Sequence, residues 1–171
     1  MQALIGSVAL GDRATLVRHY FCGASAIDLR EFVVCVGMCE LGARSEVVAS
    51  VLGRHGRTFR IADMAAAVGI CELSSRARLV GVIILTQTAT LSANARGLAQ
   101  LVGICALQQR ADLCLAALNH ASLRDQVKEC VYICALQDRA KIVKQLLAPA
   151  KTTSPSFSAT SLPSRLISSS R

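Results

Sequence analysis

The sequence predicts an all-α protein, an α-solenoid of about five helix-turn-helix repeats of roughly 31 residues each. Three observations predict this fold. One short phrase recurs five times, apolar residues follow helical spacing on both sides of each copy, and no strand pattern competes. A two-helix unit of this size cannot bury its apolar face alone, so we expect the units to stack into one continuous core.

The recurring phrase has an apolar residue or a cysteine, a leucine two positions later and an arginine three positions after the leucine. Its copies are Val8–Ala14, Cys39–Ser45, Cys71–Ala77, Cys105–Ala111 and Cys134–Ala140. Successive arginines lie 31, 32, 34 and 29 residues apart, a variation that loops of changing length allow. These copies are therefore interpreted as internal repeats.

Each repeat is expected to hold two helices. Upstream of the phrase, apolar residues at positions i, i+3 and i+7, as in Phe32, Cys35 and Cys39, predict a first helix, shortened in the first repeat to Gln2–Leu10. Apolar pairs such as Leu79-Val80 predict a second helix downstream. Small or polar residues between the leucine and the arginine predict a very short turn and an antiparallel hairpin.

Turn residues and helix breakers predict the longer connections between repeats. We expect loops at Gly23–Ser25, Gly53–Thr58, Thr88–Ser92 and Asn119–Ser122, and a capping box from Ser122 to Asp125. The repeats fill residues 1–150. Residues 151–171 are rich in Ser and Thr and contain three cations and no acid, so they are predicted to form a basic, low-complexity tail.

Composition narrows the class of protein. The chain has 171 residues, which suits one domain, and its 53% hydrophobic and 18% charged residues exclude a disordered protein. The net charge is +8, and 15 of the 19 cations are arginine, so we expect an acidic partner. The longest charge-free apolar stretch, residues 79–95, is too polar and too short to predict integral membrane insertion.

No catalytic or cofactor-binding motif occurs in the sequence, and the acids are not paired, so we expect no enzyme activity and no cofactor. The eight cysteines lie in apolar helical stretches with no secretory signal before them, which favours core packing in a reducing compartment. The three histidines have no ligand spacing to any cysteine pair, so no metal site is predicted.

Three groups of basic residues are candidates for RNA binding. The first group is the five phrase arginines, which could bind along a phosphate backbone or could instead bond the last carbonyls of the first helix of each repeat. They are Arg13, Arg44, Arg76, Arg110 and Arg139. The loop 53–60 offers cations and an aromatic ring for unpaired bases, although Phe59 could simply begin an apolar helix face: Arg54, His55, Arg57, Phe59 and Arg60. A C-terminal patch could contact a polyanion or be a solvated helix face: Arg139, Lys141, Lys144 and Lys151.

On the phrase that closes each first helix, the chain resembles the helical-repeat proteins of organelles, the octotricopeptide and heptatricopeptide types, over residues 1–150. This resemblance implies RNA binding in a mitochondrion or plastid. Together with the arginine-dominated charge and the basic tail, it leads us to expect a non-catalytic structural subunit of a large organellar ribonucleoprotein, most concretely the mitochondrial ribosome in the mitochondrial matrix.

The expected partners are structured RNA, such as ribosomal RNA, and neighbouring protein subunits. The alternative is a helical-repeat scaffold that grips a helix or peptide of another subunit within a multisubunit complex. A contiguous basic surface would favour RNA, whereas a contiguous exposed apolar patch would favour protein.

Overall fold

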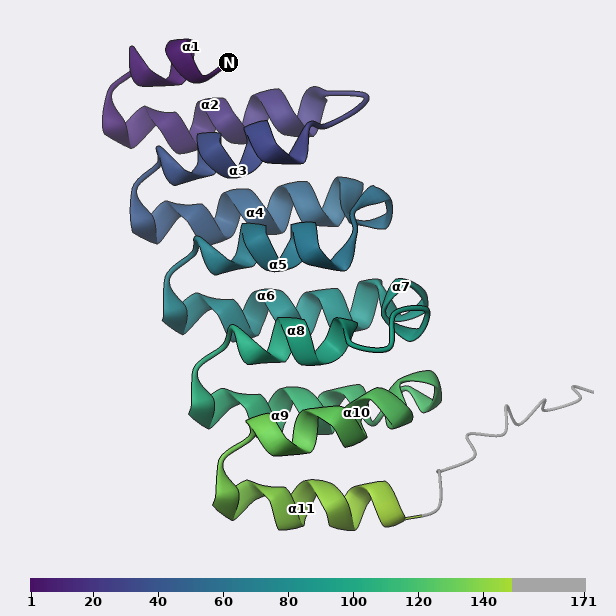
Figure 1. The fold of residues 1–171 in the computed structure, drawn as a ribbon. Helices are drawn as coiled ribbons and strands as arrows, with labels where there is room; N and C mark the ends of the chain where they lie inside the picture. The colour runs from purple at the N-terminus through teal and green to yellow at the C-terminus, as the bar shows by residue number, and fades with distance from the viewer. Residues whose placement is uncertain (149–171) are drawn as a thin grey trace, which may run out of the picture.

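The computed structural model describes residues 1–148, which are all helical apart from turns and short loops (Figure 1). The predicted all-α class is confirmed for this range. The predicted tail 151–171, including Lys151, lies outside it. The helices are α1 (Gln2–Gly6), α2 (Leu10–Gly23), α3 (Leu29–Gly37), α4 (Leu41–His55), α5 (Ile61–Gly69), α6 (Leu73–Thr86), α7 (Thr88–Ser92), α8 (Gly97–Gly103), α9 (Leu107–Ala117), α10 (Arg124–Cys130) and α11 (Leu136–Leu147), with 3₁₀ turns η1 (Gly56–Thr58), η2 (Ala121–Leu123) and η3 (Val131–Ile133).

The helices stack in chain order as two parallel rows (Figure 1). One row consists of the longer helices, in which α2 contacts α4, α4 contacts α6, α6 contacts α9, and α9 contacts α11. The other row consists of shorter helices, in which α1 contacts α3, α3 contacts α5, α5 contacts α8, and α8 contacts α10. The α1–α2 hairpin therefore lies at one end of the stack and α11 at the other (Figure 1).

One hydrophobic cluster runs between the two rows over the length of the stack. Its members come from the predicted apolar faces, and Phe21 of α2 packs edge-on against Phe32 of α3 with ring centroids 5.0 Å apart. The short-row helices have nine residues or fewer, a length that is marginal for an isolated helix in water. Their stability therefore comes from this packing and from the groups that cap their ends.

The predicted turn between the leucine and the arginine of each phrase is wrong. The long-row helices begin at the leucine itself, as at Leu41 and Leu73, so the arginine lies in the first helical turn. The chain reverses direction just before the leucine, where Glu40 and Glu72 have extended backbone angles near φ −55° and ψ 140°. Because this turn uses ordinary angles, it needs no glycine, and the small residues after the leucine gave a misleading signal.

Four other boundaries differ from the prediction. No loop forms over Gly53–Thr58, because α4 continues to His55 and Gly56–Thr58 is the turn η1. Thr88–Ser92 forms the short helix α7 instead of a loop. Ser122 lies in η2, and α10 begins after Leu123 without a side-chain cap, so the predicted capping box does not form. The first helix ends at Gly6 instead of continuing to Leu10.

The start of α8 packs unusually close to α5. A Cβ added at Gly97 would lie 3.2 Å from Ile61 Cγ1 and 3.3 Å from Asn94 Cβ. We therefore expect Gly97→Ala to lower the free energy of unfolding by about 1 kcal/mol, through overpacking. The matched change Gly53→Ala, in α4, meets no atom within 4 Å and should raise it by up to about 1 kcal/mol. Urea unfolding of both variants checks this; equal effects would contradict the close packing.

Candidate nucleic-acid interface

The phrase arginines bind backbone carbonyls at the ends of the short-row helices. In Arg76, Nε donates to the Cys71 carbonyl at 3.0 Å and Nη2 donates to the Gly69 carbonyl at 2.6 Å. The same guanidinium reaches the next segment, where Nη1 donates to the Ile104 carbonyl at 3.1 Å. One side chain therefore ties the end of α5 to the end of α8.

The other phrase arginines repeat this arrangement. Arg13, Arg44 and Arg110 each bond two carbonyls of their own segment and one of the next, and the acceptors in the next segment are those of Met38, Ile70 and Ile133. Arg139 makes only the two local bonds, to Cys134 and Tyr132, among the described residues. No further short-row helix follows α11 within residues 1–148.

These bonds match the structural alternative for the arginine column. The last four carbonyls of a helix have no partner within it, and a cation there also interacts favourably with the helix dipole. Three guanidinium nitrogens in each of four arginines are already bonded, and the exposed acids Glu40 and Glu72 lie at the same turns. Contact of this column with RNA stays a prediction.

The phrase cysteines are buried at the same ends of the short-row helices. Cys39, Cys71, Cys105 and Cys134 are each 2% exposed, and their Sγ atoms lie 3.3 to 3.6 Å from the carbonyl four residues earlier. Burial raises the pKa of the Cys71 and Cys105 thiols to about 11, against the opposing effect of the neighbouring arginines. The cysteines therefore act as small, protonated core residues, as the sequence indicated.

The last turn of α4 and the 3₁₀ turn η1 present exposed arginines. Arg54 and Arg57 are exposed and make no side-chain bond to any residue in 1–148. Arg60, whose side chain is 84% exposed, donates to Asp63 at 2.8 Å, and this hydrogen bond lowers the pKa of the Asp63 carboxyl. His55 is half-buried, and its buried Nε2 has no partner among the described groups.

Phe59 corrects the prediction for this loop. Its side chain is only 4% exposed and belongs to the hydrophobic cluster, so its ring is not available to stack on a base. It fills the core where the chain enters α5, which is the alternative that the sequence left open. The aromatic part of the predicted loop site is therefore wrong, while its cations lie at the surface.

Two further exposed arginines that the sequence analysis missed lie at the same edge of the stack. Arg30 is in the first turn of α3 and Arg96 precedes α8, just as Arg60 precedes α5. Each lies 14 to 16 residues before a phrase arginine, so an alignment of the repeats could have found them. We call the set Arg30, Arg54, Arg57, Arg60 and Arg96 the basic edge.

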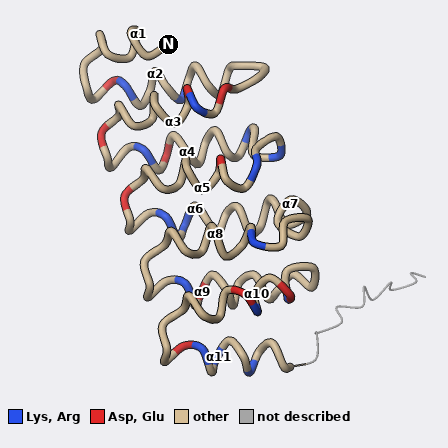
Figure 2. The backbone as a smooth tube through the Cα atoms, in the orientation of Figure 1, with Lys and Arg blue, Asp and Glu red and all other residues tan. Residues whose placement is uncertain are grey.

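Neighbouring helices bring the members of the basic edge together. Helix α5 packs against both α3 and α8, and Gly97 closely approaches Ile61, the residue after Arg60. Figure 2 shows blue segments where α4 leads into α5 and just before α8, at one end of the helices, and both blue and red segments at the opposite turns. The nearby acids are engaged, since Asp28 accepts from two backbone amides and Asp63 accepts from Arg60.

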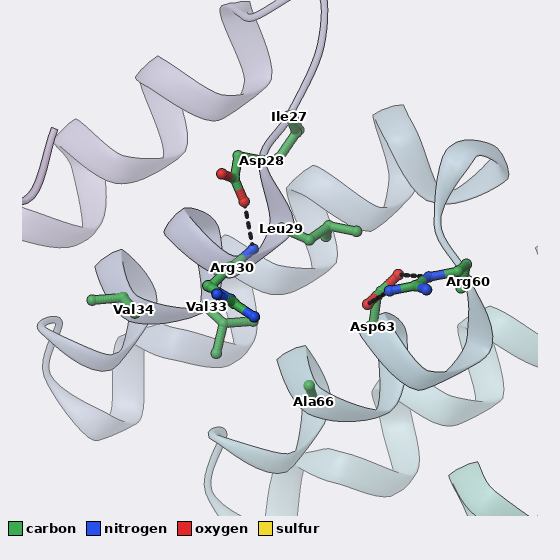
Figure 3. A pocket seen from close by; sticks show the side chains of 9 residues that line it. All are labelled: Ile27, Asp28, Leu29, Arg30, Val33, Val34, Arg60, Asp63 and Ala66. Carbon is green, nitrogen blue, oxygen red and sulfur yellow. Dashed lines mark hydrogen bonds and ion pairs between the residues drawn. The ribbon is translucent and has the colours of Figure 1, made fainter.

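An open groove of about 560 Å³ runs between α3 and α5 beside the basic edge (Figure 3). Its lining mixes apolar side chains such as Leu29 and Val33 with two arginines and two acids, namely Arg30, Arg60, Asp28 and Asp63. The groove therefore combines apolar surface with two guanidinium groups and with two carboxylates that already accept hydrogen bonds from the protein.

The C-terminal patch is less concentrated. Lys141 and Lys144 are exposed on α11, whereas Arg139 beside them is bonded to carbonyls, and Lys151 lies outside the described range. Lys128 of α10 donates to Asp125 at 2.6 Å and is neutralised locally. The patch thus contributes two unpaired lysines in residues 1–148.

Within residues 1–148, no three metal-binding side chains converge, and no helix there is long and apolar enough to cross a membrane. Comparison with protein-family models, with curated proteins and with solved structures finds no match to this chain.

The bond that spans two segments should dominate the stabilising effect of a phrase arginine. We expect Arg76→Ala to lower the free energy of unfolding by about 3 kcal/mol, because three partly buried carbonyls lose a charged donor. Arg139→Ala removes only two local bonds and should cost about half as much. Urea unfolding measures both. An Arg139 variant that loses as much free energy of unfolding as the Arg76 variant would contradict the role assigned to the bond between segments.

The buried thiols should make stability fall at alkaline pH. The unfolded chain ionises its thiols near pH 9, while the folded protein keeps Cys71 and Cys105 protonated to about pH 11. The folded state therefore holds more protons, and each thiol should reduce the free energy of unfolding by about 1 kcal/mol per pH unit in this window. A Cys71→Ala, Cys105→Ala double variant should show a shallower slope from pH 9 to 11; an unchanged slope would contradict this assignment.

Proposed function

We propose that this chain is an α-solenoid of about five repeats that binds structured RNA through its basic edge and has no catalytic role. The single observation that carries the proposal is the gathering of five exposed arginines at one edge, of which only Arg60 is paired with an acid within residues 1–148. Guanidinium groups bind phosphate with two parallel hydrogen bonds, and a row of them fits a phosphate backbone.

The proposed contact is to the RNA backbone and not to stacked bases. No aromatic residue belongs to the basic edge: Phe59, between Arg57 and Arg60 in the chain, is buried, and the exposed rings of Tyr20 and Tyr132 lie on α2 and in η3. Proteins that read single strands rely on exposed aromatic platforms. This favours recognition of folded RNA by shape and phosphate position.

The wider role that we propose is that of a structural subunit in a large organellar ribonucleoprotein, with the mitochondrial ribosome and the mitochondrial matrix as the narrowest form. The arginine-rich charge of +8 and the resemblance to organellar helical-repeat proteins support it. In such a particle, structured RNA would lie along the basic edge and other protein subunits would contact the remaining faces.

The second candidate function is a protein-interaction scaffold. The observation that favours it is the groove between α3 and α5, which is lined by apolar side chains together with Arg30 and Arg60. A helix or peptide with apolar residues and flanking acids would suit that groove. The two candidates differ in whether binding requires Arg54 and Arg57, which are not among the groove's lining residues.

An RNA-binding experiment tests the leading proposal with two variants matched in charge. Arg54→Gln with Arg57→Gln removes two cations from the basic edge, and Arg18→Gln with Arg78→Gln removes two exposed cations from α2 and α6. We expect the first variant to bind a labelled RNA stem-loop about tenfold more weakly, with a salt slope reduced by roughly 1.4 to 1.8, because two phosphate contacts are lost. The second variant should bind like the unmodified protein.

Two outcomes would contradict the proposal. The unmodified protein could show no salt-dependent affinity for the stem-loop, or both variants could lose affinity equally, which would indicate an effect of net charge alone. Binding of an acidic amphipathic peptide that survives the Arg54 and Arg57 changes, without RNA binding, would instead support the scaffold.

A further inference from the structure

The last long helix exposes two apolar positions that are buried or half-buried in the earlier segments. The second residue of the apolar pair in each long helix is fully buried at Val17, Val48, Val80 and Cys114, but Val143 of α11 is 40% exposed. One turn later, Phe21, Leu52 and Ile84 are at most 5% exposed and Leu118 is half-buried, whereas Leu147 is 81% exposed. This outgoing face, Val143 and Leu147, is the surface that the next hairpin covers elsewhere in the stack.

Arg139, which lies on the same helix as the outgoing face, lacks one hydrogen bond that the earlier phrase arginines make. The four earlier phrase arginines donate Nη1 to a carbonyl at the end of the next short helix. Arg139 makes no such bond among residues 1–148, although its Nε and Nη2 bonds match the earlier ones. The end of the stack therefore combines an apolar surface with the Nη1 group of Arg139, the donor that in the earlier segments binds a carbonyl at the end of the next short helix.

The first hairpin exposes the complementary surface. Leu4 of α1 is 55% exposed, whereas its counterparts in the later segments, Cys35, Ala67, Leu101 and Cys130, are fully buried. Tyr20 of α2 is 45% exposed, whereas Val51, Ile83 and Ala117 at the same place are at most 1% exposed. This incoming face, Leu4 and Tyr20, is the surface that a preceding long helix covers in later segments.

We propose that this chain associates head to tail, with the incoming face of one copy seated on the outgoing face of another. The occupant is a second copy because each face lacks the partner that the other supplies, and because the contact continues an interface that the chain already forms four times. In this contact, Nη1 of Arg139 donates to the carbonyl of Ser7 in the second copy, the position that corresponds to Met38 and Ile70.

The two faces differ, so the association is heterologous and can continue from copy to copy. A symmetric pair of α11 faces would bury Val143 and Leu147 but would leave Leu4 and Tyr20 exposed. Because each copy carries a charge of +8 and the contact is mainly apolar, added salt should strengthen the association. RNA binding through the basic edge should weaken with salt, so the two properties are separable.

Sedimentation of the full chain tests the proposal. We expect the mass of the unmodified protein to rise with concentration beyond that of a dimer. Val143→Glu with Leu147→Glu blocks the outgoing face, and Leu4→Glu with Tyr20→Glu blocks the incoming face; each blocked protein should be monomeric alone. An equimolar mixture of the two should form a dimer and grow no further, because each copy keeps one functional face.

Val82→Glu with Leu85→Glu is the matched control, since both residues are exposed on α6 in the middle of the stack. This variant should associate like the unmodified protein, and circular dichroism should show that all variants keep their helix content. The proposal is overturned if the unmodified protein stays monomeric at about 100 µM in 0.5 M salt, a regime of strong screening. It is also overturned if the two blocked proteins do not pair, or if α11-blocked protein still dimerises.

Discussion

The bond between a phrase arginine and the carbonyl ends of two successive short helices is the interaction on which the stack depends. A short helix leaves its last carbonyls unpaired, and burying them without partners would be costly. Arg44, Arg76 and Arg110 satisfy carbonyls of their own segment and of the following one with one rigid, always-charged group. The same bonds fix the spacing between neighbouring hairpins, so capping and stacking are accomplished together.

The sequence predicts the helices well and the joints poorly, for a physical reason. Apolar periodicity reports which residues face the core, and the buried Phe32, Cys35 and Met64 follow it. The position of a turn depends instead on backbone angles that ordinary residues adopt, which is why the chain reverses near Glu40 and not at Gly42. The spacing of the phrase arginines makes the column recognisable in the sequence. Its carbonyl acceptors in the next segment are not recognisable, because they lie far along the chain, 25 residues from Arg13 and 28 residues from Arg76, and only the packed structure brings them together.

The candidate site divides in the same way. Arg54, Arg57 and Arg60 stand out in sequence because they are dense, whereas Arg30 and Arg96 are isolated along the chain and join them only through the packing of α3, α5 and α8. The prediction that the Phe59 ring stacks on a base is wrong because the sequence alone does not distinguish an exposed aromatic side chain from one that packs in the core. The phrase arginines are therefore bonded to carbonyls at one edge. At the other edge, Arg60 pairs with Asp63, while Arg30, Arg54, Arg57 and Arg96 make no side-chain hydrogen bond within residues 1–148 and are available for an anionic partner.

NMR of the arginine side chains tests most directly whether the phrase arginines are bonded to the carbonyl ends of two successive short helices. A guanidinium held by three carbonyls should rotate slowly about its Cζ–N bonds and protect its protons from water. Arg13, Arg44, Arg76 and Arg110 should therefore give resolved, slowly exchanging Nη protons, while Arg54 and Arg57 should give averaged, fast-exchanging ones. Averaged signals for all of these arginines would contradict the central role assigned to the bond.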